Sequence, residues 1–245
     1  MLGIEPNLEH ASAQLHSHYQ NQLGFWLMSE IHFLDNLPNG DAIAHVLLAH
    51  GSMAAMDSPF LEELTENLVE RQLAVHRFEF DYMAERRSTG KKRPPPRAEK
   101  LTTEYIEAIT QVRESHVTQD EKLIVGGKSL GGRVASMVAV ECNKKKLIDG
   151  VVCLGYPFHP PKKPDKLRTE HLEDYPCAAL IAHGERDPFG SPDEIKTYAL
   201  DPRIQFHWVG DGDHDFAARK RSGFTQSGNI ATTAQAIAEF AATLK

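Results

Sequence analysis

Long apolar runs, cysteine and an excess of basic residues are scarce or absent in this 245-residue chain. No apolar run reaches the roughly 20 residues of a membrane-spanning helix, and the first residues carry glutamate and histidine rather than the pattern of a signal peptide. We therefore expect a cytoplasmic protein with no membrane partner. The net charge of −7 gives no general reason to expect binding to nucleic acid.

The three cysteines, Cys142, Cys153 and Cys177, lie in or beside apolar segments without the spacing of a metal site. This pattern favours buried free thiols in a reducing compartment over a disulfide framework. We expect no bound metal and no cofactor. One alternative stays open, because Asp213, His214 and Asp215 together could hold a metal ion.

What the sequence does contain is the composition of a soluble globular protein, with 41% hydrophobic and 25% charged residues. Apolar strand-like runs alternate with helix-like segments, which predicts an α/β fold with a doubly wound, mostly parallel sheet. No repeat or composition break separates domains. We expect an N-terminal arm over 1–20 and a single domain over 21–245.

The expected strands are an outer antiparallel one within 26–34 and buried ones at 44–49, 73–80, 122–125, 148–155, 178–183 and 204–209. The expected helices begin near 59, 99, 134 and 193, and Asn229 is expected to cap a closing helix. A long basic, proline-rich loop is expected to follow the strand that ends at 80.

The most informative stretch is Gly126–Gly132, which reads GGKSLGG between a predicted strand and a predicted helix. It contains G-x-S-x-G, the pattern of a tight turn that exposes a nucleophilic serine, here Ser129. Glycine is needed two residues before and after the serine because side chains there would collide with neighbouring backbone. A phosphate-binding loop would need a glycine where the chain has Lys122, so the serine turn is preferred.

A nucleophilic serine requires a base and an acid that orients this base. Asp187 follows the predicted strand at 178–183, and His214 follows the last predicted strand. The carboxyl ends of parallel strands meet at one sheet edge, so these residues are expected to join Ser129 in a catalytic triad. Asp211, Asp213 and Asp215 are alternative acids.

Stabilisation of a negatively charged oxygen requires backbone N–H groups near the serine. One is expected from Leu130, which opens the helix after the turn. The second is expected from Ser52 or Met53 in the loop after the strand at 44–49, where Gly51 is expected to allow close approach.

Several motifs of the chain resemble a family of small bacterial α/β-hydrolases related to a testis-expressed vertebrate protein and to the hydrolase-like subunit of a chromatin acetyltransferase complex. The resemblance covers nearly all of 40–245 and is carried by His50–Gly51, Met56–Phe60, Arg77–Phe80, Gly126–Gly132, Leu154–Pro160, Gly184–Phe189 and Gly212–Asp215. It implies the α/β-hydrolase fold and the triad Ser129, Asp187 and His214. Met53 stands where the family usually has glycine, which leaves the second oxyanion amide open.

Charge is unevenly distributed along the chain. Three loops expected beside the active face, 81–100, 159–170 and 211–221, hold fourteen basic and eight acidic residues, whereas the remainder is net negative by 13. One interpretation is an anionic substrate held by arginines, for which we single out Arg86, Arg87, Arg93 and Arg97. The other is solvated loops, with the basic proline-rich stretch at 91–97 as a partner-docking segment.

These patterns together predict an esterase-like serine hydrolase that acts on a small acyl substrate without a cofactor. No insertion is long enough for a large lid domain. The alternative is a hydrolase-fold binding or scaffold protein with little catalysis. The sequence leaves the natural substrate and the oligomeric state open.

Overall fold

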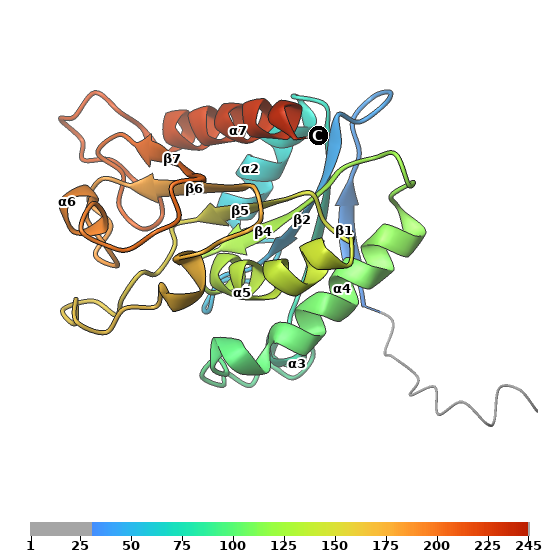
Figure 1. Ribbon diagram of the computed structural model, residues 1–245, viewed down its shortest axis with the longest axis horizontal. Coiled ribbons are helices and arrows are strands. Elements are labelled where there is room, and N and C mark those ends of the chain that lie inside the picture. The colour runs from blue at the N-terminus through green and yellow to red at the C-terminus, as the bar shows by residue number, and fades with distance from the viewer. Residues whose placement is uncertain (1–30, 245) are drawn as a thin grey trace, which may run out of the picture. The chain divides into compact units, whose positions relative to one another are not determined.

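The computed structural model describes residues 31–244, so the predicted arm over 1–20 lies outside the described residues. Seven strands form one sheet in the order β1-β3-β2-β4-β5-β6-β7 (Figure 1). The strands are β1 (Phe33–Asn36), β2 (Ala44–Ala49), β3 (Leu73–Phe78), β4 (Leu123–Lys128), β5 (Gly150–Leu154), β6 (Ala179–Gly184) and β7 (Ile204–Val209). All neighbouring pairs are parallel except β1 with β3, which confirms the predicted sheet.

Helices cover both faces of the sheet (Figure 1). They are α2 (Pro59–Val69), α3 (Asp81–Thr89), α4 (Thr102–Ser115), α5 (Leu130–Lys144), α6 (Pro192–Ile195) and α7 (Gln226–Thr243), with short 3-10 turns η1 (Ala98–Lys100) and η2 (Glu170–Leu172). Helices α2 and α7 pack together on one face, and α4 and α5 pack together on the other. None of the helices described between residues 31 and 244 is long and apolar enough to cross a membrane.

The interior follows from the apolar pattern of these elements. Strands β2 to β6 are buried along their whole length, as expected for strands with helices on both faces. Between the sheet and the first pair of helices, Leu64 and Leu68 of α2 meet Ile230 and Ile237 of α7 at helical spacing. The three cysteines are free and buried, as predicted.

Some predicted elements were wrong in extent. The segment after β3 begins with helix α3 instead of a loop, and Gly90 ends it in the left-handed conformation at φ 72°. The closing helix is capped by Thr225, whose hydroxyl accepts the N–H of Gly228, and not by Asn229. The outer strand begins at Phe33, and the earlier part of its predicted range, up to residue 30, lies outside the described residues.

Several histidines are fully or partly buried, and burial disfavours their protonated, charged form. Burial, reinforced by the nearby charge of Arg133, lowers the pKa of His171 to about 4. Burial is also the main cause that lowers the pKa of five others, which are His45, His50, His76, His183 and His207. The unfolded chain therefore binds more protons than the folded chain once the pH falls below about 6.5.

We expect the free energy of unfolding to decrease as the pH falls from 7 to 5, by about 2 kcal/mol from His171 alone. Urea unfolding at several pH values measures this decrease, and His171→Gln should make it shallower. Ser136→Ala is the matched control, because it removes the hydroxyl 2.8 Å from His171 Nε2 without removing the titrating group. Stability that is constant between pH 7 and 5 would contradict this expectation.

Candidate active site

Ser129 stands at the tight turn between β4 and α5. Its backbone has φ 52° and ψ −108°, a conformation that residues other than glycine rarely adopt. A Cβ atom at Gly127 would lie 2.3 Å from the carbonyl oxygen of Ala49, and one at Gly131 would lie 2.5 Å from the same atom. The two glycines of the motif thus permit the turn to press against the end of β2, as the sequence predicted.

The triad candidates meet at the carboxyl edge of the sheet. His214 Nδ1 lies 2.7 Å from Asp187 Oδ2, and His214 Nε2 lies 2.9 Å from Ser129 Oγ. Because a carboxylate accepts, Nδ1 carries the proton, and Nε2 is left to accept the Ser129 hydroxyl. The three residues form one continuous line of hydrogen bonds, although they follow three different strands.

Asp187 is buried, which suits a carboxylate only if hydrogen bonds compensate. Burial alone would raise its pKa, but the hydrogen bond to His214 and the electrostatic attraction of the His183 and His214 imidazoles outweigh it, so the pKa lies below the usual range. The N–H of Phe189 donates to the other carboxylate oxygen at 2.9 Å. This arrangement holds Asp187 ionised and aimed at His214.

The loop that carries His214 is fixed by groups the sequence analysis did not single out for this role. Arg186 donates to the carbonyls of Asp211 and Ala217, and the side-chain amide of Asn229 donates to the carbonyls of Gly210 and Phe216. The ring of Phe189 packs against the imidazole with centroids 4.4 Å apart. The side chain of Asn229 therefore anchors this loop and does not cap the helix.

The three alternative acids are engaged elsewhere. Asp211 binds the guanidinium of Arg219, and Asp213 accepts two backbone N–H groups of its own loop. Asp215 pairs at 3.2 Å with the ammonium of Lys128, a buried side chain whose pKa is lowered by burial. The structure therefore brings only Asp187 of the four carboxylates to His214.

The residues predicted to stabilise an oxyanion separate into two groups. Ser52 and Leu130 line one cavity together with Ser129, whereas Met53 is 68% exposed and lies outside it. Leu130 is the first residue of α5, so its N–H has no acceptor within the helix. At Gly51, the atom nearest to an added Cβ would be Cγ of Lys128, 3.6 Å away, so no other part of the described protein presses against this glycine.

The side chain of His50 fixes the loop that follows β2. Its Nε2 accepts the N–H of Phe80 at 3.2 Å, so the proton is on Nδ1, which donates to the carbonyl of Gly51 at 2.6 Å. The carbonyl of Ser52 in turn accepts the hydroxyl of Tyr82 at 3.2 Å. These bonds set the direction of the peptide units after β2.

The cavity at Ser129 has a volume of about 500 Å³ and opens to solvent. Its lining consists of Ser52, Pro95, Pro96, Arg97, Ala98, Glu99, Ser129, Leu130, Arg133, Pro157, Arg168 and Phe189. Of the four arginines predicted to bind substrate, only Arg97 belongs to it. Arg133 and Arg168 also line the cavity and were missed by the sequence analysis.

The other three predicted arginines have partners outside the cavity. Arg87 pairs with the carboxylates of Asp57 and Glu79, at 2.8 Å and 2.7 Å. Arg93 pairs with Glu85 at 2.9 Å, and Arg86 donates to the carbonyl of Met53 at 3.2 Å. Arg86 and Arg87 belong to helix α3, and their contacts reach the segment after β2 at Met53 and Asp57.

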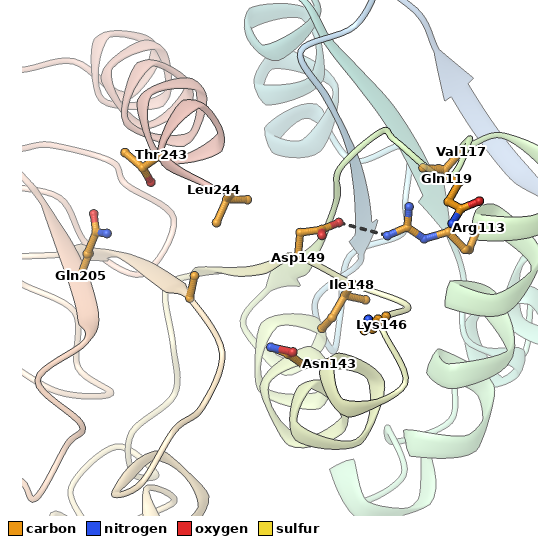
Figure 2. A pocket seen from close by; sticks show the side chains of 11 residues that line it. Arg113, Val117, Gln119, Asn143, Lys146, Ile148, Asp149, Gln205, Thr243 and Leu244 are labelled. Carbon is orange, nitrogen blue, oxygen red and sulfur yellow. Dashed lines mark hydrogen bonds and ion pairs between the residues drawn. The ribbon is translucent and has the colours of Figure 1, made fainter.

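A larger hollow of about 1050 Å³ lies among elements at the amino edge of the sheet (Figure 2). Figure 2 shows Arg113 and Asp149 joined across it, with 3.0 Å between nitrogen and oxygen, and Leu244 at its other side. Its lining contains no serine, cysteine or histidine that could attack a substrate or transfer a proton. The cavity at Ser129 is therefore the candidate active site.

One cluster in the described chain has donor atoms spaced as in a metal site. Ligand atoms of Asp35, His76 and His116 lie within 4.8 Å of one another. His76 Nδ1 is already bonded to Asp35 at 2.7 Å, and its Nε2 to His45 at 2.9 Å. These bonds account for His76 without an ion, and the cluster flanks the β1 edge of the sheet, apart from the cavity. Asp213, His214 and Asp215, which the sequence offered as an alternative metal site, do not form such a cluster within residues 31–244.

Comparison with known proteins agrees with this architecture. A dienelactone hydrolase from Anabaena variabilis superposes with a TM-score of 0.64 at 22% identity, over 86% of this chain and 92% of that one. An alpha-beta serine hydrolase homologue from Coxiella burnetii gives 0.62 at 15% identity, over 85% and 90%. A serine hydrolase without a lid from Xanthomonas campestris gives 0.61 at 16% identity, over 86% and 87%. The sequence model of the Alpha/beta hydrolase domain family matches residues 42–242, and the chain therefore belongs to that family, with the α/β-hydrolase fold that its motifs predicted.

Proposed function

We propose that this protein is a serine hydrolase that cleaves an ester or a related acyl substrate. The observation that carries the proposal is the line of hydrogen bonds from Ser129 through His214 to Asp187, at 2.9 Å and 2.7 Å. The line begins at a strained serine on a cavity wall and ends at a buried carboxylate, which is the arrangement that activates a hydroxyl. The likeness to esterases and serine hydrolases supports a hydrolase in general.

The chemistry follows from the positions of the protons. Ser129 Oγ attacks the acyl carbon while His214 Nε2 takes the hydroxyl proton, and Asp187 stabilises the resulting imidazolium. The same proton then passes to the leaving group as its bond to the acyl carbon breaks. A water molecule attacks the acyl-serine in the second half, again giving its proton to His214, and Ser129 regains a proton when the acid departs.

The carbonyl oxygen becomes negative in both tetrahedral intermediates and needs donors that are already in place. We assign this role to the backbone N–H groups of Leu130 and Ser52. Leu130 contributes an N–H with no intrahelical acceptor at the positive end of α5, and Ser52 borders the same cavity. The exposure of Met53 makes its amide the weaker candidate.

A fluorophosphonate probe tests the proposal, because it labels a serine only where an activated hydroxyl and an oxyanion site coincide. We expect stoichiometric labelling of the wild type on Ser129, and none in Ser129→Ala. Ser136→Ala is the control, because that hydroxyl lies elsewhere on α5 and bonds His171. A folded wild type that is not labelled would favour the alternative, a hydrolase-fold binding or scaffold protein.

The relationship to the testis-expressed and acetyltransferase-linked proteins stays a prediction.

A further inference from the structure

The cavity at Ser129 has an unequal charge lining. Three arginines, Arg97, Arg133 and Arg168, face one glutamate, Glu99, among the residues that form its wall. The arginines come from three separate segments, which are the proline-rich stretch before η1, helix α5 and the loop between β5 and β6. The excess of positive charge is therefore a product of the fold and does not come from one basic run of the sequence.

Arg133 is the nearest of these to the reacting groups along the chain. It stands three residues after Leu130 on α5, so the two side chains share a helix face close to the positively polarised helix start. Its guanidinium binds Glu99 at 2.8 Å and is 18% exposed. The buried Nε of the same group has no partner among the described residues, so Glu99 satisfies the cation only in part.

Arg168 is half-buried and lacks a carboxylate partner within the described part of the chain. Its backbone is fixed, since its N–H donates to Phe158 and its carbonyl accepts the hydroxyl of Tyr156, both at 2.8 Å. Among residues 31–244, its guanidinium makes only a long contact of 3.5 Å, with the carbonyl of Pro157. Burial and the charge of Arg133 both lower the pKa of Arg168, as expected for a cation that is desolvated beside another cation.

Two partly desolvated guanidinium groups with one carboxylate between them are costly unless an anion completes the set. A carboxylate suits them because guanidinium presents paired N–H donors with matching geometry. A neutral substrate would leave the charge of Arg168 without an anionic partner at the cavity wall. The lining also contains apolar side chains, among them Pro95, Pro96 and Phe189, that can contact the rest of a small molecule.

From this arrangement we propose that Arg133 and Arg168 form an anion-binding subsite, and that the substrate is a small ester carrying a carboxylate near the scissile acyl bond. The proposal rests on the hydrolase function proposed above. It retains the anionic substrate suggested by the basic loops, but assigns it to different residues. Arg97 lies on the same wall and adds to the positive field.

The test compares matched esters. In one pair the acyl part ends in a carboxylate, as in mono-p-nitrophenyl adipate, or in the neutral amide of the same length. In the second pair the leaving group carries the carboxylate or its amide. We expect kcat/KM for the anionic ester to exceed that of its neutral partner by at least about tenfold in one of the two pairs, since a paired guanidinium contact acts in a half-buried site. The ratio should approach one in Arg168→Gln and in Arg133→Gln.

Arg93→Gln serves as the matched control, because it removes an arginine of the same region that is 60% exposed and paired with Glu85 outside the cavity. The ratio in this variant should equal that of the wild type. A ratio of one in both wild-type pairs, with neutral esters hydrolysed and Ser129 labelled, would overturn the anion subsite alone. Loss of the preference in Arg93→Gln but not in Arg168→Gln would do the same. Absence of both labelling and turnover would instead overturn the hydrolase function.

Discussion

Ser129→Ala, His214→Ala and Asp187→Asn are each expected to lower kcat for an activated ester, by about a thousandfold or more for the serine and the histidine. The reason is that each change breaks the hydrogen-bonded line that ends at Asp187. The double variant Ser129→Ala with His214→Ala should be little worse than either single change, because the residues act as one unit. Steady-state kinetics with p-nitrophenyl acetate measures these losses.

Asp211→Asn provides the comparison for the acid. This carboxylate lies on the loop of His214 but binds Arg219, so its loss should affect the loop without removing the partner of the imidazole. Near-full activity in Asp187→Asn together with inactivity in a folded Asp211→Asn protein would show that the acid is wrongly assigned. Circular dichroism of each variant separates loss of chemistry from loss of fold.

Gly131→Val is expected to give a protein that folds poorly, with an unfolding midpoint well below that of the wild type. An added Cβ would lie 2.5 Å from the carbonyl oxygen of Ala49 and 2.7 Å from that of His50, and both are backbone atoms that cannot move independently of β2. Overpacking of this kind costs about 1–3 kcal/mol or more. Urea or thermal unfolding of purified protein measures the loss.

Gly51→Ala is the control for this change. It adds a methyl group to the neighbouring loop, where the nearest atom is 3.6 Å away, so its unfolding midpoint should stay close to that of the wild type. A fully stable Gly131→Val protein would show that the turn tolerates a side chain there, and the steric account of the motif would then be incorrect.

The line of side chains at the candidate active site could be predicted because the positions of its residues follow from the sheet. Ser129, Asp187 and His214 each follow a parallel strand, and the register aligns the ends of those strands. The sequence order alone then places the residues at one edge. The need for glycine on either side of the serine could also be predicted, because it depends on the geometry of the turn itself.

The arginines could not be assigned in the same way. Arg87 stands in a basic stretch, but its partners Asp57 and Glu79 come from two other segments, and their approach depends on the position of α3. Helix α3 has no apolar face in its sequence, since Met83 is its only buried residue, and the helix could therefore not be predicted from the hydrophobic pattern. Arg168 reaches the cavity from a loop whose course is set by tertiary hydrogen bonds.

The wall formed by Pro95 and Pro96 has a thermodynamic consequence for any ligand of the cavity. The pyrrolidine ring already fixes the φ angle of each residue, so this segment has little conformational entropy left to lose when a ligand settles against it. Loops that order on binding subtract that loss from the affinity of every ligand. A wall that is already rigid loses little entropy on binding. Discrimination among ligands then depends on the chemical groups that contact the wall and not on how far the wall must move.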